Sequence, residues 1–215
     1  MRNPWLDIPL ADYEGHMALP EVGQAQLLSD IFAGALCKHQ PRSVALLGCA
    51  GGNGLDRVSS KVTQRVVGVD LNPDYILQTR ARFHHRLPLL ELFAGDVQKD
   101  AFGFAPVELV FAGLLFEYVD AQTLLARIRS MLRPGGTLIT IVQLPSASIA
   151  EITPSQFTCL GALAPLMHLV PPKLLGQLAV ALGYIETETC TLEAAGGKAF
   201  QVQAFRLAMA ANVQD

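Results

Sequence analysis

Short apolar runs alternate with helical stretches along most of this chain, and that alternation limits the fold more than any other feature. Strands are predicted over 43–47, 65–70, 91–94 and 108–112. The last of these runs is almost wholly apolar, which is typical of a central strand covered on both faces. Strands separated by helices pair in parallel, because each crossover returns the chain to the same edge of the sheet. The sequence therefore predicts an α/β fold, a parallel sheet with helices on both faces.

Helix boundaries and apolar periodicity complete this pattern. Asn72 suits the cap of a helix, Pro73 presets the backbone of the first turn, and Asp74 faces the positive end of the helix dipole. The chain shows neither an internal repeat nor a domain linker, so we expect one domain. Helices are predicted over 20–40, 72–85, 120–132 and 171–182, and three later strands over 137–143, 184–191 and 200–208.

Charge and composition exclude several classes of protein. A length of 215 residues favours one large domain. With 19 acidic and 16 basic residues the net charge is −3, which provides no basic face for nucleic acid. Hydrophobic residues make up 51% of the chain and the mean hydropathy is +0.33, so disorder is excluded. This apolar surplus predicts an exposed patch, either a homodimer interface or an apolar substrate pocket.

Cysteine spacing and one uncharged stretch bear on location. The cysteines form no CxxC pair, so neither a metal site nor a disulfide framework is expected, and the natural location is cytoplasmic. The N-terminus is too polar for a signal peptide. Residues 152–172 carry no charge, but prolines and polar groups leave fewer apolar residues than the ~20 of a membrane span. We expect a buried or capping helix there. The cysteines are Cys37, Cys49, Cys159 and Cys190.

A glycine-rich turn follows the first predicted strand. Residues 48–54 contain four glycines, which let the backbone pass close to a ligand at the start of a short helix. Asp70 ends the next strand, where a carboxylate can accept both hydroxyls of a ribose lying across the sheet. The turn alone is a weak signal, and the acid makes it more specific.

Other nucleotide-binding motifs are not met. In a dinucleotide-binding G-x-G-x-x-G that begins at Gly52 and Gly54, the third glycine is replaced by Arg57. In one that begins at Gly48, the second glycine is replaced by Ala50. No Gly-Lys-Ser/Thr follows, so a P-loop is excluded as well. An NAD-dependent oxidoreductase is therefore only a weak alternative.

Four segments together resemble the class I S-adenosylmethionine-dependent methyltransferases of the small-molecule type. Residues 44–54 resemble that family's first motif, 67–72 its ribose-binding segment, 94–97 its adenine-contacting segment, and 132–138 the turn before strand five. They occur in the family's order and spacing. The resemblance implies a Rossmann-like, doubly wound, seven-stranded, mostly parallel sheet with an antiparallel last strand. It also implies S-adenosyl-L-methionine as cofactor.

Two positions depart from the family's pattern. Leu46 stands where the family usually has an acid that helps to order the glycine loop. Ala50 stands where it has a second glycine, and its methyl group is tolerable where φ is negative. These departures keep a second hypothesis open, a non-catalytic binding or regulatory subunit with the same fold.

The resemblance also implies roles for single residues. Gly48, Ala50 and Gly52 would border the methionine end of the cofactor, and Tyr13 would touch its carboxylate. Asp70 would hold the ribose. Asp96 would accept a hydrogen bond from the adenine amino group, or it is simply a turn residue. Leu71 and Val97 would pack against the adenine. The whole predicted cofactor-binding set is Tyr13, Gly48, Cys49, Ala50, Gly52, Asp70, Leu71, Asp96, Val97 and Leu115.

Methyl transfer is an in-line displacement in which a general base is optional. His16 is one candidate base, although a surface residue of the lead-in segment is the more ordinary interpretation. Glu117 follows the fourth strand and is the other candidate, unless it caps or pairs locally. Gln143 at the tip of the fifth strand is expected to point into the pocket. His168 is expected to be a satisfied core histidine.

The chain is therefore expected to be a single methyltransferase domain over 1–215. Its parts are an N-terminal lid and first helix (1–42), a cofactor-binding core (43–143), a substrate-capping insertion (144–170), and a last helix with two strands (171–215). Apolar residues of the insertion predict a small, apolar or aromatic acceptor, and no nucleic acid or membrane partner. These residues are Phe157, Leu160, Leu163, Leu166 and Met167.

Overall fold

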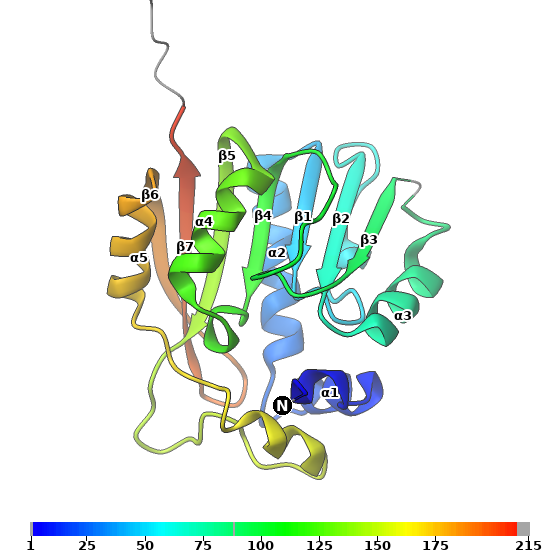
Figure 1. Ribbon diagram of the computed structural model, residues 1–215. Helices are drawn as coiled ribbons and strands as arrows, with labels where there is room; N and C mark the ends of the chain where they lie inside the picture. The colour runs from blue at the N-terminus through cyan, green and yellow to red at the C-terminus, as the bar shows by residue number, and fades with distance from the viewer. Residues whose placement is uncertain (1, 88, 210–215) are drawn as a thin grey trace, which may run out of the picture.

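A computed structural model of the chain describes residues 2–87 and 89–209. They form a seven-stranded sheet with the order β3-β2-β1-β4-β5-β7-β6 (Figure 1). Neighbouring strands from β3 to β5 pair in parallel, whereas β7 runs antiparallel to both β5 and β6. The predicted fold is confirmed. The strands are β1 (Ser43–Leu47), β2 (Arg65–Asp70), β3 (Leu90–Ala94), β4 (Val107–Gly113), β5 (Leu132–Gln143), β6 (Tyr184–Glu193) and β7 (Ala199–Leu207).

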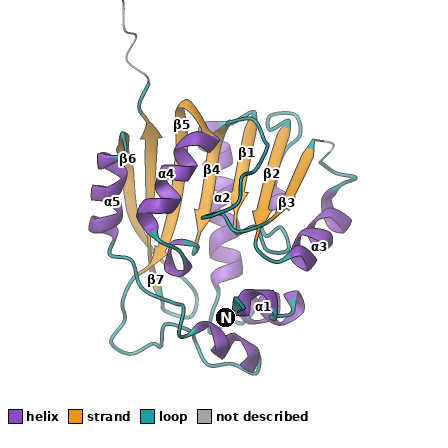
Figure 2. Ribbon diagram, in the orientation of Figure 1, coloured by secondary structure: helices purple, strands orange, loops and turns teal. Residues whose placement is uncertain are grey.

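Helices cover both faces of the sheet (Figure 2). Alternate residues of β1 show the division, because Ala45 and Leu47 pack in one apolar cluster and Val44 and Leu46 in the other. The first cluster includes α4 and α5, and the second includes α2 and α3. The α-helices are α1 (Leu10–Ala18), α2 (Gln24–His39), α3 (Pro73–Phe83), α4 (Ala121–Met131) and α5 (Pro172–Ala181).

Two helix starts follow the chemistry expected of their caps. The Asn72 side chain accepts a hydrogen bond of 2.9 Å from the amide of Asp74 at the start of α3. The Asp120 side chain accepts one of 2.8 Å from the amide of Thr123 at the start of α4. These caps satisfy amides that lack partners within the helix, and so they fix where each helix begins.

The irregular segments differ from expectation. Residues 144–170 contain one short 3₁₀ helix, η4 (Thr158–Leu163), and the helix predicted from residue 152 onward is wrong. Prolines at 154, 165 and 171 explain this, since each lacks an amide proton and restricts the residue before it. The helix after the glycine loop is only η2 (Leu55–Arg57), and the N-terminal segment folds into η1 (Pro4–Leu6) and α1.

These N-terminal elements and the 144–170 segment lie at one end of the sheet. Figure 1 shows α1 and η4 beyond the carboxyl ends of the parallel strands. That edge is where ligands bind in open α/β sheets. None of the helices in the described ranges is long and apolar enough to cross a membrane.

Candidate functional site

Three adjoining cavities lie at the carboxyl ends of the parallel strands. The loop cavity, about 400 Å³, borders the glycine-rich turn. The Asp70 cavity, about 100 Å³, borders the ends of β2 and β4. The Glu117 cavity, about 50 Å³, lies beneath the 144–170 segment. Tyr13 lines all three, so it stands at their junction.

The glycine-rich turn adopts backbone conformations that favour glycine. Gly48 has φ of +70° and Gly52 of +85°, and a Cβ at Gly52 would lie only 2.7 Å from the Phe83 ring. Ala50 also has a positive φ, +46°. The negative φ on which its tolerance rested is therefore wrong, and Ala50 holds a left-handed conformation that costs a residue with a side chain about 1–2 kcal/mol.

Hydrogen bonds on both sides hold Ala50 in that conformation. Its amide donates to Asp70 Oδ2 at 2.8 Å, and its carbonyl accepts from Thr79 Oγ1 at 2.7 Å. Both partners are buried. Leu46, where an acid was expected, is a buried core residue instead. Asp70 and Thr79 therefore order this loop, and Thr79 was not predicted, because its role depends on how α3 packs against the turn.

Asp70 lines the crevice, and its carboxylate has hydrogen-bond acceptor positions that no described residue uses. Its Oδ1 accepts from the amide of Asn72 at 2.9 Å and its Oδ2 from Ala50. Burial raises the pKa of Asp70 to about 6, against the opposing effect of these amides. A carboxylate has about four acceptor positions, so two remain for hydroxyl donors. The ribose-binding role implied for Asp70 stays a prediction, and this geometry is compatible with it.

Asp96 has the hydrogen bonds of a turn residue, and its contact with the adenine stays a prediction. It lines the Asp70 cavity, yet its Oδ1 accepts from the amide of Gln98 at 2.9 Å and its Oδ2 from Lys99 Nζ at 2.8 Å. Burial would raise the pKa of Asp96, but the Lys99 and Gln98 hydrogen bonds and the positive charges of Lys99 and Arg127 hold it below its usual value. Asp96 is therefore an ionised turn residue at the cavity wall.

The structure brings the predicted cofactor residues into two adjoining cavities. Cys49 and Gly52 line the loop cavity. The Cys49 thiol is buried, which raises its pKa well above the usual value. The eight others line the Asp70 cavity, namely Tyr13, Gly48, Ala50, Asp70, Leu71, Asp96, Val97 and Leu115.

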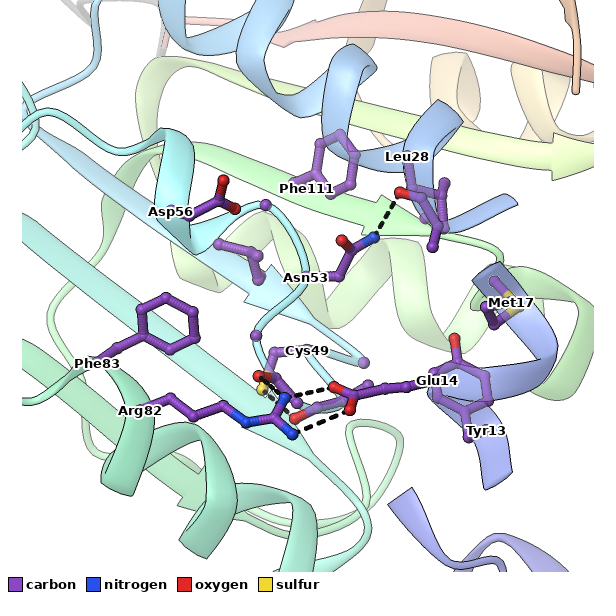
Figure 3. A pocket seen from close by; sticks show the side chains of 18 of the residues that line it. Tyr13, Glu14, Met17, Leu28, Cys49, Asn53, Asp56, Arg82, Phe83 and Phe111 are labelled. Atoms are coloured by element: carbon purple, nitrogen blue, oxygen red, sulfur yellow. Dashed lines mark hydrogen bonds and ion pairs between the residues drawn. The ribbon is translucent and has the colours of Figure 1, made fainter. Parts of the chain in front are cut away.

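Helix α1 is fastened over the loop cavity by an ion pair (Figure 3). Arg82 on α3 donates from Nη2 to Glu14 Oε2 at 2.9 Å and from Nη1 to the carbonyl of Gly51 at 3.1 Å. Arg82 is exposed, and its bonds join α3 to α1 and to the glycine-rich turn. Tyr13 stacks on Tyr75 with ring centroids 6.2 Å apart. Residues of the N-terminal segment thus line the crevice.

The candidate bases meet in the Glu117 cavity. Glu117, in the 3₁₀ helix η3 (Phe116–Tyr118), is fully buried, and its Oε1 accepts from the amide of Gln143 at 2.7 Å. Burial raises the pKa of Glu117 to about 7. His16 is 6% exposed, so the surface interpretation is wrong, and its Nδ1 lies 2.9 Å from Ser155 Oγ. Burial, followed by the charge of Lys198, lowers the pKa of His16.

Lys198 also lines this cavity and was missed by sequence analysis. It is 3% exposed, and its Nζ donates to the carbonyl of Glu151 at 2.6 Å. Burial lowers the pKa of Lys198 to about 8. A lone lysine beside Gly196 and Gly197 gives no signal of burial, because the loop that carries it packs against distant residues.

Two expectations about the capping segment are wrong. His168 is exposed rather than a core residue, and it reaches Glu117 only through its backbone amide. Leu166 is 39% exposed and does not face the cavity. The segment lacks helical periodicity, so inward and outward residues could not be separated by spacing. Leu160, Leu163 and Met167 do line the Glu117 cavity.

Comparisons with known proteins agree with this geometry. Residues 44–136 match a family model described as "Methyltransferase domain". Trans-aconitate 2-methyltransferase of Methylobacterium radiotolerans is 32% identical over 127 residues, 58% of this chain and 46% of that protein. N-methyltransferase NodS of Bradyrhizobium japonicum WM9, solved with S-adenosyl-l-homocysteine, has a TM-score of 0.65 at 16% identity, covering 86% of this chain and 87% of that one. The [4+2]-cyclase SpnF has a TM-score of 0.66 at 11% identity, covering 86% and 82%.

The sheet order and the crevice define a doubly wound α/β protein with a ligand site at the carboxyl edge of its strands. Residues 44–136, which include the glycine-rich turn and Asp70, are the part of the chain that is similar to the methyltransferase domain. The chain spans less than half the length of the curated relatives it matches, 46% of one and 34% of the other.

Proposed function

We propose that this chain is an S-adenosylmethionine-dependent methyltransferase that acts on a small acceptor. The observation that carries the proposal is the Asp70 cavity, in which a buried carboxylate with free acceptor positions faces the wall formed by Leu71 and Val97. When bound, the cofactor supplies an activated methyl group on a sulfonium. The protein's own contribution is to bind, orient and exclude water.

The residues present fit that cofactor. Asp70 would accept the ribose hydroxyls with the positions that its two amide bonds leave free. Leu71 and Val97 would pack against the adenine, and Asp96 would accept from its amino group. The positive φ of Gly48 and Ala50 bends the backbone close to the ligand. Because Asp70 and Thr79 order the loop, Leu46 no longer argues for a subunit that has lost cofactor binding.

The acceptor approaches from the Glu117 cavity on the other side of Tyr13. Trp5, Tyr13, Leu114 and Tyr118 line both this cavity and the Asp70 cavity, so the two sites share a wall. Leu160 and Leu163 close the far side. Such an enclosed space suits a small molecule rather than a macromolecule. Glu117, with its pKa near neutrality, can take a proton from the acceptor, and His16 is the second candidate.

Isothermal titration with S-adenosyl-L-homocysteine tests cofactor binding. We expect wild type to bind and Asp70→Asn to weaken binding about tenfold or more, since hydrogen bonds to a charged group contribute about 1.5–3 kcal/mol. Asp74→Asn is the matched control, because Asp74 is exposed on α3, and it should bind as wild type does. Circular dichroism and thermal melts check that each variant is folded.

A competition on wild type alone makes the test independent of variants. Adenosine should displace the bound ligand better than 2′,3′-dideoxyadenosine, because only adenosine offers hydroxyls to Asp70. No binding at millimolar ligand would overturn the proposal and favour the non-catalytic subunit. Equal competition by the two nucleosides would remove the role assigned to Asp70.

A further inference from the structure

Two buried titratable side chains in the Glu117 cavity, Glu117 and Lys198, form no ion pair within the described ranges, although the charge of Glu151 acts on Lys198. Glu117 Oε2 is buried and has no hydrogen-bond partner among residues 2–87 and 89–209. The Lys198 ammonium has three donors, and the single bond found for it in the described part of the chain goes to the carbonyl of Glu151. No ion pair joins Lys198 to Glu117 within those ranges. Buried charges are normally paired, so this arrangement calls for a ligand.

The surroundings of these two groups define the ligand further. Trp5, Leu160 and Leu163 are among the apolar side chains of the wall, which also includes Gln24, Gln143 and Glu151. His16 adds a ring whose pKa is lowered by burial and by Lys198, so it is neutral at pH 7 and brings no further charge. A wholly apolar ligand would leave both charges unpaired, which is costly. A ligand with one acidic and one donor group would satisfy both.

Resting on the proposed function, we propose that the Glu117 cavity binds the methyl acceptor and that this acceptor is a small hydroxy acid or amino acid. Its carboxylate pairs with Lys198, and its hydroxyl or amino group donates to Glu117 Oε2. Its apolar body packs against Leu160 and Leu163. This refines the apolar or aromatic acceptor expected from sequence, by adding an anionic group.

Binding requires the 144–170 segment to move outward. The cavity of about 50 Å³ holds a few water molecules, whereas small-ligand sites are commonly about 300 Å³ or larger. The segment carries only a short 3₁₀ helix and is held to Lys198 and Gln143 through the carbonyl of Glu151. A carboxylate can pair with the donors of Lys198 that this carbonyl leaves free, once the segment makes room for it. Acceptor binding and displacement of the segment are therefore expected to occur together.

A matched set of probes tests the proposal by calorimetry without cofactor. Phenyllactate and phenylalanine carry both polar groups, 3-phenylpropionate lacks the donor, and 3-phenylpropanol lacks the acid. We expect the first two to bind at least tenfold more tightly than 3-phenylpropionate, and 3-phenylpropanol to bind most weakly. Equal affinity for 3-phenylpropanol and phenyllactate would overturn the proposal, and this comparison needs no variant.

Variants then assign the two contacts. Lys198→Met should weaken phenyllactate binding at least tenfold and leave 3-phenylpropanol unchanged. Glu117→Gln should weaken phenylalanine more than phenyllactate, because the ammonium loses a charged acceptor. Lys173→Met, an exposed lysine on α5, is the control and should bind as wild type does. Wild-type affinity of Lys198→Met for phenyllactate would also overturn the proposal.

The outcome is separable from that of the proposed function. If the protein binds S-adenosyl-L-homocysteine but neither phenyllactate nor phenylalanine, the proposed class of acceptor is overturned and the proposed function stands. If it binds these acids but not S-adenosyl-L-homocysteine, the acid-binding site is supported and the proposed methyltransferase function is overturned.

Discussion

Ala50 keeps its left-handed backbone because two neighbouring elements hold its peptide groups. Asp70 binds its amide from β2, and Thr79 binds its carbonyl from α3. The side chain itself contributes strain, since φ is +46°. The loop geometry is thus imposed by its surroundings rather than by its own residue type, which explains how the family's glycine could be replaced here.

Replacing Ala50 by glycine should therefore stabilise the protein. We expect the free energy of unfolding to rise by about 0.5–1 kcal/mol, because relief of the strained φ outweighs the extra entropy of glycine in the unfolded chain. Urea denaturation measures it. Ala126→Gly, at an exposed position inside α4, should have the opposite sign and a similar size. A loss of stability in Ala50→Gly would contradict the strain argument.

Glu117 should make stability depend on pH. Burial raises its pKa from 4.5 to about 7, so the folded state binds the proton more strongly than the unfolded state. Stability from this group is then complete below pH 4.5 and is lost as pH rises toward 7, by about 3 kcal/mol in all. Other titratable groups line the same cavity and modify this curve, namely Tyr13, His16, Tyr118, Glu151 and Lys198.

Glu117→Gln removes that dependence. We expect the variant to lose less stability than wild type between pH 5 and 7 in urea denaturation. Asp70, whose pKa is raised from 3.8 to about 6, contributes with the same sign at lower pH and is retained in the variant. If the free energy of unfolding changed equally with pH in the two proteins, the raised pKa of Glu117 would be wrong.

At the scale of elements, the β6–β7 hairpin interlocks with the connection between α1 and α2. A Cβ on Gly196 would lie 1.9 Å from the carbonyl oxygen of Glu21, and one on Gly23 would lie 2.9 Å from Ala195. The two backbones touch where each has no side chain. The hairpin that carries Lys198 thus supports the helix that carries His16 and Tyr13.

Gly196→Ala should disrupt this contact. We expect a loss of about 1–3 kcal/mol, since a backbone carbonyl cannot move aside as a flexible side chain does. Gly34→Ala is the control, because its Cβ meets nothing within 4 Å and it lies inside α2, where alanine should stabilise the protein by about 0.5–1 kcal/mol. Thermal melts compare the stability of the two variants. Equal changes in melting temperature for Gly196→Ala and Gly34→Ala would contradict the interlock.

At the scale of the whole molecule, the sheet was predictable because its signal is local. The bounds of β1 and β2 match the apolar runs at 43–47 and 65–70, and the caps of α3 and α4 follow from Asn72 and Asp120. The edge that carries the crevice follows from parallel pairing alone. Asp70 could be found because its place at the end of a strand fixes where it points.

The rest of the site depends on tertiary packing. Thr79 and Lys198 have no sequence context that marks them, and each becomes significant through a contact with a distant carbonyl. The 144–170 segment has no regular spacing of apolar residues, so the exposure of Leu166 and His168 could not be inferred from the sequence. A homodimer and a cytoplasmic location stay predictions.

The interlock of Gly23 with Ala195 and of Gly196 with Glu21 has a consequence for biosynthesis. A ribosome releases the first helix long before the hairpin that supports it. Until the β6–β7 hairpin has emerged, the connection between α1 and α2 lacks the backbone that packs against it in the folded protein. Cofactor capture is therefore expected only after the β6–β7 hairpin has left the ribosome.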